Sequence, residues 1–157
     1  MYDLHHDLLD AFKATPDLLN GLLNPIDTAQ ARSATGGDEN WSVVEVICHL
    51  RDAEEFFIKR YQSMRDQENP VIVGYDQEAL ARERNYKNAD IRASLASFNA
   101  LRRQTISELS RLTPEQWQHQ GQHNELGQIT IFAQAIHHVA HDAIHCAQIA
   151  RQVNAVI

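Results

Sequence analysis

The chain has 157 residues, of which 43% are hydrophobic, and a formal net charge of -7 at pH 7. This length and composition predict one globular domain that covers residues 1–157. The negative charge argues against nucleic-acid binding, no apolar stretch is long enough to span a membrane, and the N-terminus lacks the pattern of a signal peptide, so we expect a cytoplasmic protein.

Helical periodicity begins at the N-terminus. Apolar residues at helical spacing run through residues 3–23, where Pro16 either kinks one helix or begins a second one. Residues 24–40 are rich in Asn, Thr, Ser and Gly, which predicts a loop. A second long helix is expected to follow Ser42, because Ser42 and Glu45 have the spacing of a capping box.

The rest of the chain continues this alternation of helices and loops. After the second helix ends near residue 65, the predicted elements are a turn (67–75), a short helix (76–84), a third long helix (90–111), a helical turn (113–117), a loop (119–129) and a fourth long helix (130–153). Four long amphipathic helices joined by loops predict an all-α fold, namely a four-helix bundle with long connecting loops. Metal sites in such bundles form between side chains on facing helices.

Histidines concentrate in the fourth predicted helix. His137, His141 and His145 follow one another at intervals of four residues, so they share one helix face. A His-x3-His pair can bind one ion, and either His137 with His141 or His141 with His145 satisfies that spacing. His49 lies in the second helix, and three protein ligands with an open position are typical of catalytic metals.

Both cysteines neighbour candidate ligands in sequence. Cys48 precedes His49, and Cys146 follows His145. Adjacent residues on a helix point about 100° apart, so neither thiol is expected to bind the same metal. Two cysteines also cannot form a disulfide framework, and we interpret both as small buried side chains.

Several motifs occur together and in a characteristic order. They are Thr15-Pro16 in a leucine-rich helix, Trp41-Ser42-x-x-Glu45-Val46-x-x-His49-Leu50-x-Asp52-x-Glu54, Gly127-x-x-Thr130 at a helix start, and His141-Asp142-x-x-His145-x-x-Gln148. The set resembles the DinB-like family of metal-dependent bundle proteins, also called the DinB/YfiT-like superfamily, over nearly the whole chain.

The resemblance implies a four-helix bundle that forms a homodimer and holds a divalent metal, zinc or nickel, through three histidines. Carried onto this sequence, the three ligands are His49, His141 and His145. Asp52, His137 and Gln148 are further candidates, either to orient these ligands or to contact the substrate, although each could equally be a solvated side chain. His138 is interpreted as having no role in the site.

Two enzymatic functions and two non-enzymatic alternatives remain open from the sequence. Characterised members of the family use bacillithiol or mycothiol, so one version is a transferase in which the metal activates a low-molecular-weight thiol against a small-molecule electrophile. In the hydrolase version the metal activates water. The first non-enzymatic alternative is a metal-binding bundle without catalysis that serves in a stress response. The second is a helical bundle that binds no metal and has a histidine-rich face.

Overall fold

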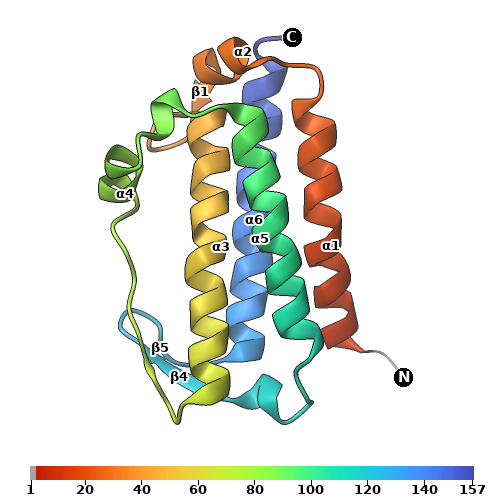
Figure 1. Cartoon of the computed structure of the whole chain (residues 1–157), viewed down its shortest axis with the longest axis vertical. Helices are drawn as coiled ribbons and strands as arrows, with labels where there is room; N and C mark the ends of the chain where they lie inside the picture. The colour runs from red at the N-terminus through yellow and green to blue at the C-terminus, as the bar shows by residue number, and fades with distance from the viewer. Residues whose placement is uncertain (1–2) are drawn as a thin grey trace.

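The computed structural model describes residues 3–157 and consists mainly of four long helices packed side by side (Figure 1). These helices are α1 (Leu4–Leu23), α3 (Val43–Asp66), α5 (Ile91–Ser110) and α6 (Ile131–Asn154). The predicted four-helix bundle is therefore confirmed. Across residues 3–157, no helix combines the length and the apolar character that a membrane crossing needs.

The four helices have an unusual order around the bundle. Both α1 and α3 pack against α5 and α6, so α1 and α3 lie diagonally opposite each other. In Figure 1, α1 and α6 run in one direction and α3 and α5 in the other. Because α3 and α5 are parallel, the chain between them must return along the whole bundle. This crossover carries α4 (Gln77–Glu83) and the 3-10 turn η1 (Tyr86–Asn88).

The long helices begin where the local sequence predicts. Ser42 and Glu45 form the expected capping box: the Ser42 hydroxyl accepts from the Glu45 backbone N–H at 3.3 Å, and the Glu45 carboxylate accepts from the Ser42 N–H at 2.8 Å. Asp90 and Thr130 cap α5 and α6 in the same way, each accepting a backbone N–H three residues ahead. These caps satisfy donors that have no partner within the helix.

Helix α1 continues through Pro16, so the alternative of a second helix beginning there is wrong. Pro16 has no N–H to donate to the carbonyl of Phe12 four residues earlier. The Arg102 guanidinium of α5 donates to that carbonyl instead, at 3.3 Å. A tertiary contact thus satisfies the group that proline leaves without a partner.

The predicted loop over residues 24–40 contains a short helix, α2 (Thr28–Ser33). Asp27 and Gln30 form a capping box at its start, with hydrogen bonds of 2.8 and 3.0 Å. A helix of six residues has too few apolar positions to show periodicity. The capping residues were not recognised because the surrounding segment is rich in other polar residues.

Short strands occupy other segments that were expected to be irregular. Strands β1 (Thr35–Gly36) and β2 (Trp41–Ser42) pair with each other, β4 (Gln120–His123) and β5 (Gly127–Thr130) form an antiparallel hairpin, and β3 (Val71–Ile72) pairs in parallel with β4. The prediction of a loop over residues 119–129 is therefore wrong. Strands of two to four residues are too short for alternation to be visible. The remaining element is the 3-10 turn η2 (Gln116–Gln118).

The core of the bundle divides into two apolar clusters with a polar layer between them. One cluster, which includes Ile47 and Phe98, lies toward the end that carries α2, and the other, which includes Phe57 and Met64, lies toward the hairpin. The buried polar side chains of the middle layer are His49, Glu54, Arg102, His138 and Asp142. This polar layer includes one of the predicted metal ligands, His49.

Candidate metal centre

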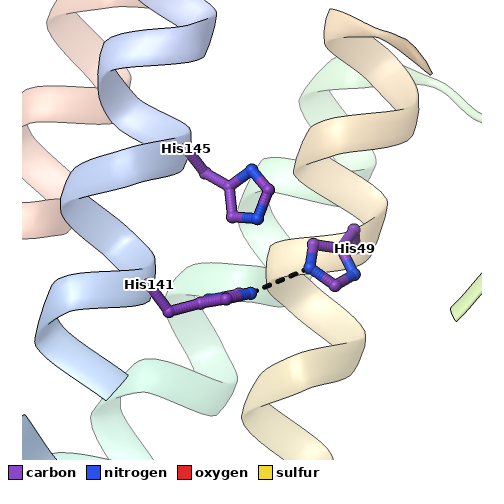
Figure 2. A group of neighbouring side chains, drawn as sticks. All are labelled: His49, His141 and His145. Carbon is purple, nitrogen blue, oxygen red and sulfur yellow. Dashed lines mark hydrogen bonds between the residues drawn. The ribbon is translucent and has the colours of Figure 1, made fainter. Parts of the chain in front are cut away.

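Two facing helices bring the three predicted ligands together. His49 projects from α3, and His141 and His145 project from consecutive turns of α6 toward it (Figure 2). The Nε2 atoms of His49 and His141 lie 2.9 Å apart, and one nitrogen from each of the three rings lies within 4.8 Å of the others. Because histidine binds zinc at about 2.0–2.1 Å, the donor atoms of one site must lie a few ångströms apart, as these do.

Burial keeps the imidazoles of His49 and His141 in the form that binds metals. Burial, together with the nearby His145 ring, lowers the pKa of His49 to about 3, against a smaller opposing effect of Asp52. Burial and the neighbouring rings of His49 and His145 lower the pKa of His141 to about 2. Both rings are therefore neutral at physiological pH, and a neutral imidazole is the metal-binding form.

The hydrogen bonds around the histidines also fit a metal site. His145 Nδ1–H donates to the Gln148 side-chain oxygen at 2.9 Å, which leaves the Nε2 lone pair of His145 available to an ion. The Gln148 amide nitrogen donates to the Gly36 carbonyl at 3.2 Å, and this second bond sets the orientation of the amide. The Nδ1 atom of His141 is buried without a partner among the described residues. The donor set thus fits a divalent cation.

The loop that supports Gln148 depends on glycine. Gly37 has a φ of +76°, and a Cβ added there would lie 2.5 Å from the Gln148 amide nitrogen. Glycine allows both this backbone conformation and this close approach. The β1–β2 turn therefore contributes to the orientation of His145, a candidate ligand on α6.

We expect the substitution Gln148→Leu to weaken metal binding about 10- to 100-fold, because His145 loses the acceptor that orients its ring. Competition with a chromogenic chelator measures the affinity. Gln152→Leu is the matched control: Gln152 donates to the Ala34 and Trp41 carbonyls, so its loss disturbs the same loop without touching His145. Equal losses in the two variants would mean that Gln148 acts only on the loop.

The structure does not bring Asp52 into hydrogen-bonding contact with the three histidines. Its carboxylate accepts from Tyr86 and pairs with Arg51 at 2.7 Å and Arg84 at 3.0 Å. These contacts tie α3 to the crossover. Asp52 acts on His49 through its charge alone, which opposes the lowering of the pKa of that ring.

A cleft of about 260 Å³ is lined by two of the three histidines, His49 and His141. The groove between α3 and α6 supplies part of its lining, and the crossover and the β4–β5 turn supply the rest. The lining residues that bear on its chemistry are His49, Phe56, Phe57, Arg60, Tyr75, His123, Glu125, His137 and His141. His137 therefore lies in the cleft, one turn away from His141, and is not part of the convergent group of three.

A second polar group fills the bundle interior beside the metal centre. The Glu54 carboxylate binds Arg102, which donates through Nε at 3.0 Å, and also Thr105 at 2.5 Å and His138 at 2.8 Å. The same guanidinium pairs with Asp142 at 2.8 Å. Burial alone would raise the pKa of Glu54, but His138 and Arg102 together hold it well below its ordinary value.

Sequence reasoning missed this group of buried charges. His138, which was expected to have no role in the site, has one in the core: it bonds Glu54, and its ring stacks on Phe57 at 3.7 Å. A signal was available in α5, because Arg102 and Thr105 continue the spacing of Leu95, Phe98 and Leu109 along one buried face. An arginine at such a position indicates a buried partner carboxylate.

Comparison with known proteins supports what the fold and the histidine geometry indicate. A family model of the DinB superfamily matches residues 11–149 of the sequence. This chain belongs to the DinB superfamily. The resemblance that the sequence motifs carry is thereby confirmed.

Two relatives within the DinB superfamily are provisionally named metal-dependent hydrolases. OB0782 of Oceanobacillus iheyensis is 29% identical over 150 residues, which cover 90% of this chain and 85% of the relative. YfiT of Bacillus subtilis is 29% identical over 112 residues, which cover 66% of this chain and 63% of the relative. The solved structure of YfiT superposes with a TM-score of 0.89 and 23% identity, covers 99% of this chain and 90% of that chain, and is described as an unusual four-helix bundle.

Proposed function

We propose that this protein is a metal-dependent hydrolase that acts on small molecules bound in the cleft beside His49, His141 and His145. One observation carries the proposal: three imidazole nitrogens converge within 4.8 Å at the edge of that cleft. The names of OB0782 and YfiT support the same reaction class. Zinc and nickel are the metals that the family resemblance favours.

Among residues 3–157, the cleft lacks the hydroxyl, thiol and amine side chains of serine, threonine, cysteine and lysine, which commonly serve as nucleophiles. Both cysteines are buried, and burial raises the pKa of Cys146 to about 11 and also raises that of Cys48. We therefore propose that the attacking group comes from solution, as water or as a small thiol.

A divalent cation held by the three histidines would supply Lewis acidity, which lowers the pKa of water or of a thiol and polarises a carbonyl or phosphoryl group of the substrate through its oxygen. The chain contributes proton-handling groups nearby. His123 Nδ1 accepts the backbone N–H groups of Glu125 and Leu126 at 3.1 and 3.2 Å, so the neutral ring carries its proton on Nε2 as a donor. Burial and Arg60 lower the pKa of His137, which favours a neutral ring that can accept a proton.

The thiol-dependent transferase is the second candidate, because the absence of serine, threonine, cysteine and lysine from the described lining of the cleft fits it as well as it fits a hydrolase. It is also the activity that the family resemblance suggests. The two functions differ only in the molecule that attacks. A homodimer stays a prediction of the resemblance.

The test compares zinc-loaded, nickel-loaded and chelator-treated protein against a panel of esters and amides, with and without a small thiol. Metal-dependent turnover of the panel without thiol supports the hydrolase, and turnover that requires the thiol supports the transferase. His141→Ala, with its fold verified by circular dichroism, is the control and should be inactive. A loaded protein without any turnover would contradict both enzymatic functions and favour the non-catalytic metal-binding alternative.

A further inference from the structure

We propose that Arg60 binds a carboxylate group of the substrate, so that the cleft selects small organic acids with an apolar or aromatic body. This inference rests on the proposed function of the cleft as the substrate site. Arg60 is not a candidate metal ligand, so binding of a carboxylate to it can be tested in protein that holds no metal.

Arg60 lies on the same side of α3 as the metal-site histidine. His49, Phe56, Phe57 and Arg60 all line the cleft, and helical side chains lean toward the N-terminus of their helix, which here means toward His49. The ring of Phe57 lies 5.5 Å from the guanidinium carbon of Arg60 and 6.1 Å from the ring of His141. Arg60 and His141 therefore lie close to the same ring and line the same cleft, so one small molecule in the cleft can contact both.

The Arg60 guanidinium has spare donors and no ion-pair partner. One nitrogen, Nη2, donates to the Val73 carbonyl at 3.2 Å, and no carboxylate within residues 3–157 lies within 4.0 Å of it. By contrast, Arg51, Arg84 and Arg102 each have such a partner. Burial lowers the pKa of Arg60, a sign of incomplete solvation that an anionic ligand would offset.

The other titratable groups that line the cleft supply no second positive charge beside Arg60. His123 and His137 face Arg60, and both have a pKa lowered chiefly by burial and then by Arg60 itself. Glu125, on the exposed β4–β5 turn, also lines the cleft, so the formal charge there is small. One guanidinium matches one carboxylate in a two-point hydrogen bond, whereas a doubly charged phosphate would need further cations.

The walls of the cleft define the body of the ligand. The rings of Phe56 and Tyr75 stack at 3.9 Å, and both line the cleft together with the edge of the core at Phe57. The volume of about 260 Å³ is below the usual range of about 300–1,000 Å³ for pockets that hold drug-sized ligands. The cleft therefore fits a compact acid with a flat or apolar body.

The experiment uses benzoate and benzamide, which have nearly the same shape and differ in charge. Calorimetric titration of the full-length, chelator-treated protein measures binding of each without a contribution from metal, and His141→Ala provides a second background that cannot hold it. We expect benzoate to bind at least about tenfold more tightly than benzamide, and Arg60→Gln to remove that preference. Lys59→Gln is the matched control, because it removes the same charge one residue away, outside the lining of the cleft.

Three outcomes would overturn the proposal: no detectable binding of benzoate, equal binding of benzoate and benzamide, or unchanged benzoate affinity in Arg60→Gln. The comparison of the two probes on the unmodified chain remains decisive if Arg60→Gln folds poorly. Failure of the hydrolase proposal would give a different result: the metal-loaded protein would show no turnover, while benzoate binding would persist.

Discussion

Replacing His49, His141 or His145 with alanine is expected to abolish stoichiometric metal binding. The loss of affinity should exceed the roughly 100-fold loss that follows from removing a residue hydrogen-bonded to a metal ligand. Each histidine supplies one of three convergent nitrogens, so each variant leaves only two. Elemental analysis of untagged protein purified without chelators gives the stoichiometry. Titration with zinc and nickel then gives the affinity.

His137→Ala is the matched control for the three ligand variants. His137 lies on the same helix and continues the same spacing, but the structure places it in the cleft, outside the convergent group. It should retain about one metal per chain. Retention of metal by all three ligand variants, or its loss in His137→Ala, would show that the ion binds elsewhere or that the pair His137 and His141 holds it.

The substitution Glu54→Gln is expected to lower the free energy of unfolding by about 3–5 kcal/mol, as removing one partner of a buried ion pair typically does. Arg102 is completely buried, and the loss of Glu54 would leave its charge with Asp142 as its sole carboxylate partner among the described residues. Chemical denaturation at neutral pH measures the change. A neutral amide has nearly the same volume, so the effect reports charge and hydrogen bonding, with packing nearly unchanged.

Glu55→Gln is the control for this substitution. Glu55 is the next residue along α3 and pairs with Arg84 at 3.3 Å near the surface. Exposed ion pairs contribute about 0–1 kcal/mol, so this variant should stay close to the parent in stability. Similar losses in the two variants would contradict the role assigned to the buried group.

The same pair of variants tests the pH dependence of stability. Because His138 and Arg102 hold the pKa of Glu54 below its ordinary value of 4.5, its carboxylate stabilises the folded state above that pH. The stabilisation is lost as the pH falls below 4.5 and the unfolded chain takes up the proton first. Glu54→Gln should therefore have a flatter stability profile below pH 4.5 than Glu55→Gln.

Local signals in the sequence determined the long helices of this protein. The capping box of Ser42 and Glu45, together with the caps at Asp90 and Thr130, set helix starts that the structure confirms. Helical periodicity determined which residues share a face, and so placed His141 and His145 one turn apart. These properties depend on interactions over three or four residues, which the sequence displays directly.

Only the tertiary structure decided how those faces meet. The packing of α3 against α6 places the His49 ring 4.9 Å from that of His141 and 4.8 Å from that of His145, whereas the four-residue spacing taken alone also allowed the pair His137 and His141. The pairing of β3 with β4, the contact of Arg102 with the Phe12 carbonyl and the buried group around Glu54 all join residues about 50 or more positions apart. Such contacts depend on the relative placement of whole helices, which the spacing of residues along the sequence does not predict.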